Sequence, residues 1–238
     1  MMLESTSDDC RSAPDSNEPN PQVFLVDDHQ IELDLMQRWC ERGGYHTLTF
    51  DRPEELLVSL PEDPFGCVVA DLQMPKLTGL ELQRELRERG FLLPVILVTG
   101  HGDAENCRTA FKQGAFDFIE KGFDAVHLLE TIGRAIHRNR RDRFHSQIRR
   151  NARRLLETVS PREQEVMRLL SSGMSLKGIA QELGISVQTV SKHRGSIFSK
   201  LRIDNEVDLY KTVLAADLDL DQIAASLPQP AGPSAIEL

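Results

Sequence analysis

Short apolar runs of strand length recur along the first half of the chain, and amphipathic segments of helix length separate them. The expected strands cover residues 23–26, 47–50, 67–70, 95–98 and 116–119. The expected helices cover about 31–42, 53–60, 79–89, 103–113 and 124–136. Apolar strands that alternate with helices predict a parallel sheet covered on both faces. Five such units favour an α/β doubly wound, five-stranded parallel sheet over a closed barrel, which needs eight.

The second half of the chain has only helical signals. Ser160, Pro161 and Glu163 together form a typical helix start, with a capping box and a proline at the first helical position. We expect four short helices, of which the second ends at Gly184 and the third begins after Ser186. Only three residues separate the second helix from the third, which is the spacing of a helix-turn-helix. The sequence therefore predicts a small all-α helix-turn-helix domain after the α/β domain.

Charge divides the chain in the same way. The net charge of the 238 residues is −9, yet residues 23–133 carry −10 and residues 134–154 carry nine arginines and one aspartate. Residues 155–216 are nearly neutral, and the ends, 1–22 and 217–238, are both acidic. This distribution is not typical of a single-domain enzyme. We predict a disordered acidic tail (1–21), an α/β domain (22–136), a basic helical linker (137–156), a helix-turn-helix domain (157–216) and an acidic, proline-containing tail (217–238).

Several protein classes are disfavoured by composition. No run approaches 18 consecutive apolar residues, so we expect no transmembrane helix and no contact with membranes. The polar, acidic N-terminus does not resemble a signal peptide. The four cysteines, Cys10, Cys40, Cys67 and Cys107, lie far apart and form no C-x-x-C pair, which disfavours a zinc ribbon or a redox dithiol. A reducing cytoplasm is the expected location.

The basic linker is expected to be a stiff helix, because residues 134–160 contain no glycine or proline and their apolar positions follow helical spacing. Its arginines have three interpretations that the sequence leaves open. They are a solvated helix face, an attraction for DNA phosphate, or a counter-charge to the acidic domain in a closed state. A dimeric coiled coil fits the heptad pattern poorly.

Polar side chains follow four of the expected strands. Asp27 and Asp28 come after the first strand, Asp71 after the third, Thr99 after the fourth and Lys121 after the fifth. Ligands of doubly wound sheets bind at the edge formed by the carboxyl ends of the strands. Three clustered carboxylates repel one another unless a cation lies among them, and their hard oxygens suit Mg²⁺. The hydroxyl and ammonium groups suit the oxygens of a transferring phosphoryl group, for which a carboxylate is a competent nucleophile. Helix capping would explain one such aspartate, but not five matching residues at four strand ends.

The family resemblance rests on VFLVDD, VVADLQMPKLTGLEL, VILVTGHGD and AFDFIEK. These segments, over about residues 22–135, resemble the receiver domain of two-component response regulators. The resemblance implies that Asp71 is the site of phosphorylation by a sensor histidine kinase. It also implies that Mg²⁺ is bound by Asp27, Asp28, Asp71 and the backbone carbonyl of Gln73.

The same resemblance assigns the remaining residues of the site. Thr99 and Lys121 would contact the phosphoryl group, and Phe118 occupies the position of the family's switch aromatic. Simple core burial is the alternative interpretation of Phe118. Gln73 and His101 lie where the family tunes dephosphorylation, and we expect them to set the lifetime of the phosphate.

One departure from the family concerns the residue after the lysine. The family usually has Lys-Pro with a cis bond, whereas this chain has Lys121-Gly122. Because a cis bond before a non-proline residue costs roughly 2.5–4 kcal/mol, we expect a trans bond or a mobile loop here.

The second domain carries its own resemblance. The run LETVSPREQEVMRLLSSGMSLKGIAQELGISVQTVSKHRGSIFSKL, within about residues 155–216, is similar to the LuxR-type DNA-binding domain. Helical spacing places four residues on one face of the third helix that can enter a major groove: Gln188, Ser191, Lys192 and Gly195. Four flanking residues are candidate phosphate contacts: Thr189, His193, Arg194 and Lys200. Gly195 either permits close approach of the helix to DNA or means that base recognition is weaker at this position. The order of the domains most resembles the FixJ-like subgroup of response regulators.

The resemblances together predict a transcription regulator that dimerises and binds promoter DNA when Asp71 is phosphorylated, with RNA polymerase as a further candidate partner. We expect no enzymatic function beyond assistance to the chain's own phosphoryl transfer and dephosphorylation. The alternative is an atypical regulator that binds DNA without phosphorylation. An aspartyl phosphohydrolase is a weaker alternative, since that class needs a second acid where this chain has Gln73. A dinucleotide enzyme is weaker still, because Gly100-His101-Gly102 lacks the third glycine.

Overall fold

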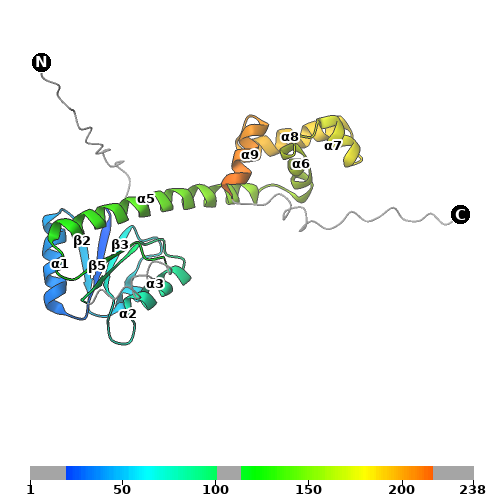
Figure 1. Ribbon diagram of the computed structural model, residues 1–238. Helices are drawn as coiled ribbons and strands as arrows, with labels where there is room; N and C mark the ends of the chain where they lie inside the picture. Colours follow the sequence, from blue (N-terminus) through cyan, green and yellow to red (C-terminus); the bar gives the residue numbers. More distant parts are fainter. Residues whose placement is uncertain (1–19, 101–113, 217–238) are drawn as a thin grey trace, which may run out of the picture. The chain divides into compact units, whose positions relative to one another are not determined.

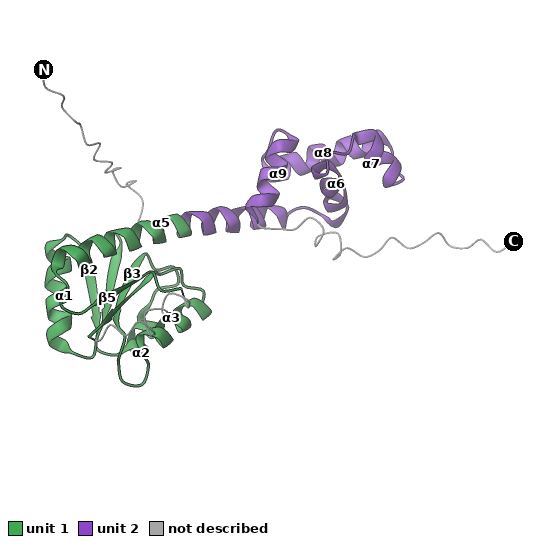
Figure 2. Cartoon of the chain, viewed as in Figure 1, with its two compact units in different colours: residues 1–143 green, residues 144–238 purple. Residues whose placement is uncertain are grey.

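The computed structural model describes residues 20–100 and 114–216, and the chain separates into two compact units (Figure 2). The first unit covers residues 1–143 and the second covers residues 144–238. The boundary lies within the basic segment that the sequence predicts as a linker. Residues 1–19 of the predicted N-terminal tail, the predicted C-terminal tail and the predicted helix over 103–113 lie outside the described residues.

A five-stranded, all-parallel sheet forms the centre of the first unit, as the sequence predicts (Figure 1). The strand order is β2-β1-β3-β4-β5. The strands are β1 (Gln22–Val26), β2 (His46–Phe50), β3 (Gly66–Asp71), β4 (Val95–Thr99) and β5 (Asp117–Glu120). Every residue of β3 and β4 is buried, which explains why these strands are continuous apolar runs.

Helices cover both faces of the sheet (Figure 1). Among the described residues of the first unit, the helices are α1 (Gln30–Arg42), α2 (Pro53–Ser59), α3 (Gly79–Glu88) and the beginning of α5 (Ala125–Leu156). Side chains of α1 and α5, such as Leu33 and Ile132, share one apolar cluster with the sheet. Side chains of α2 and α3, such as Leu56 and Leu82, share the cluster on the opposite face. The sheet therefore lies between two separate apolar layers.

Helix α5 is one continuous helix of 32 residues, which confirms the prediction of a helical connector. Its first half is built into the first unit, where Asn139 is fully buried. The Asn139 side chain accepts a hydrogen bond from the N–H of Gly66 at 3.0 Å and donates one to the carbonyl of Leu92 at 2.7 Å. In the described part of the chain, neither α5 nor any other helix combines the length and the apolar character needed to cross a membrane.

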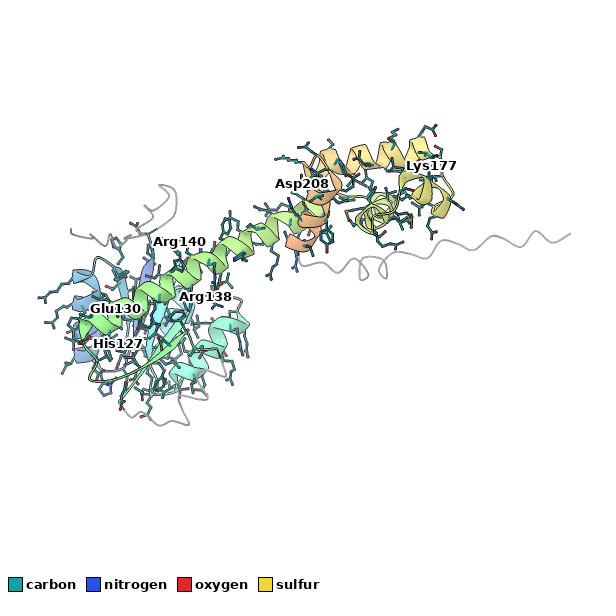
Figure 3. The ribbon with its side chains drawn as sticks, turned by 45° about the horizontal axis from the view of Figure 1, so that its top comes forward. His127, Glu130, Arg138, Arg140, Lys177 and Asp208 are labelled. Atoms are coloured by element: carbon teal, nitrogen blue, oxygen red, sulfur yellow. The ribbon has the colours of Figure 1, made fainter. Side chains whose placement is uncertain are left out.

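Arginines hold the next turn of α5 to the loop before β3. Arg143 donates to the Asp63 carboxylate at 2.7 Å and to the Pro64 carbonyl at 2.9 Å. The guanidinium groups of Arg140 and Arg143 also lie over the ring of Phe65, at 5.5 and 5.3 Å from its centre. Figure 3 shows Arg140 on this part of α5. These arginines are therefore structural contacts of the first unit and not only a solvated face.

Up to residue 216, where the description of the second unit ends, it consists of the end of α5 and four further helices. They are α6 (Pro161–Ser171), α7 (Leu176–Glu182), α8 (Val187–Leu201) and α9 (Glu206–Ala215). Ala152 and Leu156 of α5 are buried in the same cluster as the apolar side chains of these helices. The four-helix prediction is thus confirmed, and α5 contributes core residues to both units.

The turn between α7 and α8 has the expected chemistry. Gly184 has a positive φ of 63°, a conformation that favours glycine, and the N–H of Ile185 returns to the Ala180 carbonyl at 3.0 Å. The Ser186 hydroxyl accepts a hydrogen bond from the N–H of Thr189 at 3.1 Å. These contacts end α7 and begin α8 within three residues.

Candidate functional site

The residues predicted to form the acidic site meet at the carboxyl edge of the sheet. Asp27 follows β1, while Asp71 and Thr99 are the last residues of β3 and β4. Asp27, Asp71 and Thr99 are all buried. Lys121 follows β5, and its backbone N–H bonds to the Thr99 carbonyl at 2.6 Å. Because these strands are parallel neighbours, the sheet itself brings the side chains together.

The ammonium group of Lys121 lies among three carboxylates. Its Nζ is 2.7 Å from Oδ1 of Asp71, 3.2 Å from Oδ2 of Asp27 and 2.6 Å from Oε2 of Glu32. Burial by itself would lower the pKa of Lys121. The hydrogen bonds to Asp71 and Glu32 and the negative charges nearby outweigh burial and raise that pKa above its usual range. Lys121 is therefore a permanent cation at the centre of the site.

In each of the two buried aspartates, the carboxylate oxygen that does not contact Lys121 accepts a hydrogen bond from a backbone N–H. Oδ2 of Asp71 accepts a hydrogen bond from the N–H of Gln73 at 2.7 Å, and Oδ1 of Asp27 accepts one from the N–H of His29 at 2.8 Å. Burial raises the pKa of Asp27, and the bonds to His29 and Lys121 oppose this effect. These backbone contacts fix both carboxylates in orientation.

Asp28 and His29 form the more exposed side of the site. Nδ1 of His29 lies 3.1 Å from Oδ1 of Asp28 and 3.4 Å from Oδ1 of Asp27. The ligand atoms of these three residues lie within 4.8 Å of one another, close enough to hold one metal ion. The Lys121 ammonium contacts the carboxylates of Asp27, Asp71 and Glu32, and Asp28 adds a fourth acid beside Asp27. This excess of hard, negatively charged oxygens fits a divalent cation such as Mg²⁺.

Three further positions that the sequence singled out are Gly122, Phe118 and His101. The bond between Lys121 and Gly122 is trans, one of the two outcomes expected from the sequence, and Gly122 has a φ of 104°. Phe118 lies on β5, is partly buried and packs against the cluster beneath α2 and α3. Its burial agrees with the core interpretation, and its role as a switch stays a prediction. His101 lies outside the described residues.

Sequence reasoning missed two members of the site, Glu32 and His29. Glu32 lies four residues after Asp28 in the first turn of α1. Because Asp28 lies before the N-cap residue His29, helical spacing does not relate the two carboxylates, and the sequence held no local signal for Glu32. His29 is adjacent to the aspartate pair. It was missed because the predicted metal site used only oxygen ligands.

The predicted DNA-reading face of α8 is exposed. Its members are Gln188, Ser191, Lys192 and Gly195. The opposite side of the helix is buried in the apolar core through Val190, Ile197, Phe198 and Leu201. A Cβ at position 195 would meet nothing within 4 Å apart from the helix's own backbone, so this glycine faces open space. The spacing therefore identified the two faces of α8 correctly.

Two of the flanking cations have partners within the second unit. Nε of Arg194 donates to Glu206 at 2.7 Å, and the Arg194 guanidinium lies 4.3 Å from the centre of the Phe198 ring. Nζ of Lys200 lies 2.5 Å from Oε2 of Glu163. Among the flanking candidates, Thr189 is 2.8 Å from the Ser186 hydroxyl, and His193 is partly exposed. Lys192 is thus the exposed cation of the reading face, whereas Arg194 and Lys200 also have structural contacts.

Comparison with known proteins gives matches for both units. Residues 23–133 match the model of the response regulator receiver domain, and residues 157–213 match that of the LuxR family of bacterial regulatory proteins. The transcriptional regulatory protein TdiR of Thauera aromatica is 37% identical over 192 residues, which cover 81% of this chain and 85% of TdiR. The transcriptional regulatory protein FixJ of Bradyrhizobium diazoefficiens is 31% identical and is covered over 96% of its length.

Solved structures show the same similarity. The structure of the response regulator StyR matches with a TM-score of 0.74 and 32% identity, covering 82% of this chain and 99% of that structure. A crystal structure of full-length FixJ matches with a TM-score of 0.51 and 30% identity, covering 84% of this chain and 98% of that structure. The similarity therefore extends through both units.

Proposed function

The chain belongs to the two-component response regulators that join a receiver domain to a LuxR-type DNA-binding domain, and on this premise we propose that phosphorylation of Asp71 controls its binding to DNA. The observation that carries the proposal is the 2.7 Å contact between Nζ of Lys121 and Oδ1 of Asp71 at the carboxyl edge of the sheet. A buried carboxylate beside a permanent cation is prepared to take up a dianionic group. Two relatives that match over 85% and 96% of their own length are named as transcriptional regulatory proteins.

The reaction is a transfer between two proteins. A sensor histidine kinase presents a phosphohistidine, and a carboxylate oxygen of Asp71 attacks the phosphorus atom. The phosphorus–oxygen bond of an acyl phosphate forms, the phosphorus–nitrogen bond breaks, and the electron pair returns to the imidazole of the kinase. The backbone N–H of Gln73 orients the Asp71 carboxylate through Oδ2.

The surrounding residues stabilise the transferring group. Asp27, Asp28, Asp71 and the Gln73 carbonyl are the residues that would hold Mg²⁺. When bound, Mg²⁺ supplies positive charge that neutralises the phosphoryl oxygens. Lys121, whose Nζ lies 2.7 Å from Oδ1 of Asp71, contributes a second cation. The Thr99 hydroxyl, at the end of β4, is the further donor that we assign to the phosphoryl oxygens.

The new charge on Asp71 is the signal. A phosphoryl group carries about −1.5 to −2 charges near pH 7, and it attracts the Thr99 hydroxyl and the Lys121 ammonium. We expect Phe118 to move with Thr99, because β4 and β5 are paired strands. This movement promotes dimerisation, and two copies of α8 then read half-sites about one turn of DNA apart. RNA polymerase is the further partner of such a complex, and Gln73 and His101 set the phosphate lifetime.

Binding to DNA tests this proposal. DNA duplexes that the phosphorylated protein selects from a randomised pool are titrated with the wild type and the Asp71→Asn variant, each with and without acetyl phosphate and Mg²⁺. We expect acetyl phosphate to strengthen binding of the wild type and to leave Asp71→Asn unchanged. Equal binding by all four samples would instead identify a regulator that acts without phosphorylation.

A further inference from the structure

The Lys121 ammonium has three N–H bonds and three carboxylate partners, Asp27, Asp71 and Glu32. Under the proposed function, two of these partners change during the reaction. Asp27 is a ligand of the metal ion, and Asp71 becomes an acyl phosphate. Glu32 alone keeps a free carboxylate throughout, and it is the nearest of the three, at 2.6 Å from Nζ.

The loop that carries Lys121 gives the side chain little support of its own. Strand β5 ends at Glu120, directly before Lys121. The next residue, Gly122, has a φ of 104° and no atom within 4 Å of the position that a Cβ would occupy. The peptide bond is trans and has no proline ring to restrict it. The bond from the Lys121 N–H to the Thr99 carbonyl holds the backbone, and the ammonium at the end of the side chain is placed mainly by its ionic partners.

Helix α1 supplies the fixed point. Glu32 lies in the first turn of α1, and this helix packs on the sheet through Leu33 and Met36. The Glu32 side chain is 40% exposed, whereas the Lys121 side chain is only 20% exposed and reaches into the buried part of the site. An exposed ion pair contributes little, but here one partner is held close to two buried carboxylates.

We propose that Glu32 is a positioning residue that holds the Lys121 ammonium over the site while Asp27 and Asp71 exchange their partners. This inference rests on the proposed phosphorylation of Asp71. It assigns to a helix side chain the support that a proline ring after the lysine would otherwise give. Glu32 acts through Lys121 and does not itself touch the phosphoryl group.

The first test is the initial rate of Asp71 phosphorylation by acetyl phosphate with Mg²⁺, measured by intact mass. The Glu32→Gln variant keeps the size of the side chain and removes its charge, and we expect it to react about fivefold to tenfold more slowly. The control is Glu41→Gln near the other end of α1, where the carboxylate accepts a hydrogen bond from Gln37. We expect the control to react as the wild type does. An unchanged rate in Glu32→Gln would overturn the inference.

The second test follows Lys121 itself and needs no phosphorylation. The folded full-length protein is treated briefly with an amine-acetylating reagent, and peptide mass analysis compares acetylation of Lys121 with that of Lys211, which is 71% exposed. We expect Lys121 to react faster in Glu32→Gln than in the wild type or in Glu41→Gln. Slower phosphorylation without this change would mean that Glu32 acts by another route. A wild type that forms no adduct on Asp71 would refute the proposed function, whatever the acetylation shows.

Discussion

The ammonium group of Lys200 lies 2.5 Å from the Glu163 carboxylate and connects α8 to the start of α6. Oε2 of Glu163 also accepts hydrogen bonds from the N–H and the hydroxyl of Ser160, at 2.8 and 2.7 Å. Its other oxygen accepts a bond from the hydroxyl of Ser196 at 2.7 Å. Burial by itself would raise the pKa of Glu163, but these bonds outweigh it and lower the pKa to about 2. One carboxylate therefore caps α6 and orients the helix that we expect to read DNA.

We predict that this carboxylate makes the second unit sensitive to acid. The pKa of Glu163 is about 2 in the folded protein against an ordinary value of 4.5, so its stabilising effect is complete above pH 4.5. The effect is lost as the pH falls from 4.5 towards 2. Urea unfolding over this range should show a smaller pH dependence for Glu163→Gln than for the wild type. Glu165→Gln, which alters only an ion pair with Arg162, should keep the wild-type dependence.

The free energy of unfolding near pH 7 supplies a second check on Glu163. Glu163→Gln should lower it by about 1–3 kcal/mol, because the charge-assisted bonds to Lys200 and Ser196 are weakened. A variant as stable as the wild type would show that the carboxylate does not join α6 to α8.

The exposed cation of α8 is expected to contact DNA phosphate or a base edge. Lys192→Ala should weaken DNA binding and reduce the slope of log affinity against log salt by about one. The matched control is Lys211→Ala, an exposed lysine of α9 that pairs with Asp208. Fluorescence anisotropy at several salt concentrations measures both variants. Equal slopes for Lys192→Ala and the wild type would remove Lys192 from the interface.

Gly195 offers a test of the two interpretations that the sequence left open. A methyl group at this position meets nothing within 4 Å apart from the helix's own backbone, so Gly195→Ala should raise the free energy of unfolding by about 0.5–1 kcal/mol. Thermal unfolding measures this gain. If Gly195 permits close approach to DNA, the more stable variant will bind DNA less tightly. Unchanged affinity would support the interpretation of weak reading at this position.

We predict that the buried side chain of Asn139 stabilises the packing of α5 on the first unit. Asn139→Ala leaves the buried N–H of Gly66 without its partner and should lower the free energy of unfolding by about 1–3 kcal/mol. Asn151→Ala, at an exposed position of the same helix, should change it by less than about 0.5 kcal/mol. Chemical denaturation of both variants makes the comparison. Equal stability of the two variants would contradict this role of Asn139.

The arrangement of Asp27, Asp71, Thr99 and Lys121 could be predicted because it depends on simple geometry. Parallel strands place their carboxyl ends at one edge, so residues that follow different strands meet there. Glu32 depends instead on how α1 begins after the loop and on how far the side chain of Lys121 extends. Neither is encoded in a local pattern, and both became visible only in the folded chain.

The face of α8 was equally accessible to sequence reasoning, since helical spacing separates exposed from buried positions. The ion-pair partners of the cations on α8 could not be predicted from the sequence. Lys200 meets Glu163, which lies 37 residues earlier, and Arg194 meets Glu206 of the next helix. A charge pattern shows that a lysine is present but not whether a distant carboxylate already binds it. For this reason Lys200 and Arg194, predicted as phosphate contacts, also stabilise the domain.

The most direct test of the central claim is the intact mass of the protein after incubation with Mg²⁺ and acetyl phosphate, for the wild type and Asp71→Ala. We expect one phosphoryl adduct on the wild type, stable in acid and labile in base, and none on the variant. A sizing column run on the same samples should show dimers only where the adduct forms. If the wild type gains no adduct, or if Asp71→Ala gains the same one, Asp71 is not the phosphorylated residue and the proposed control of DNA binding is wrong.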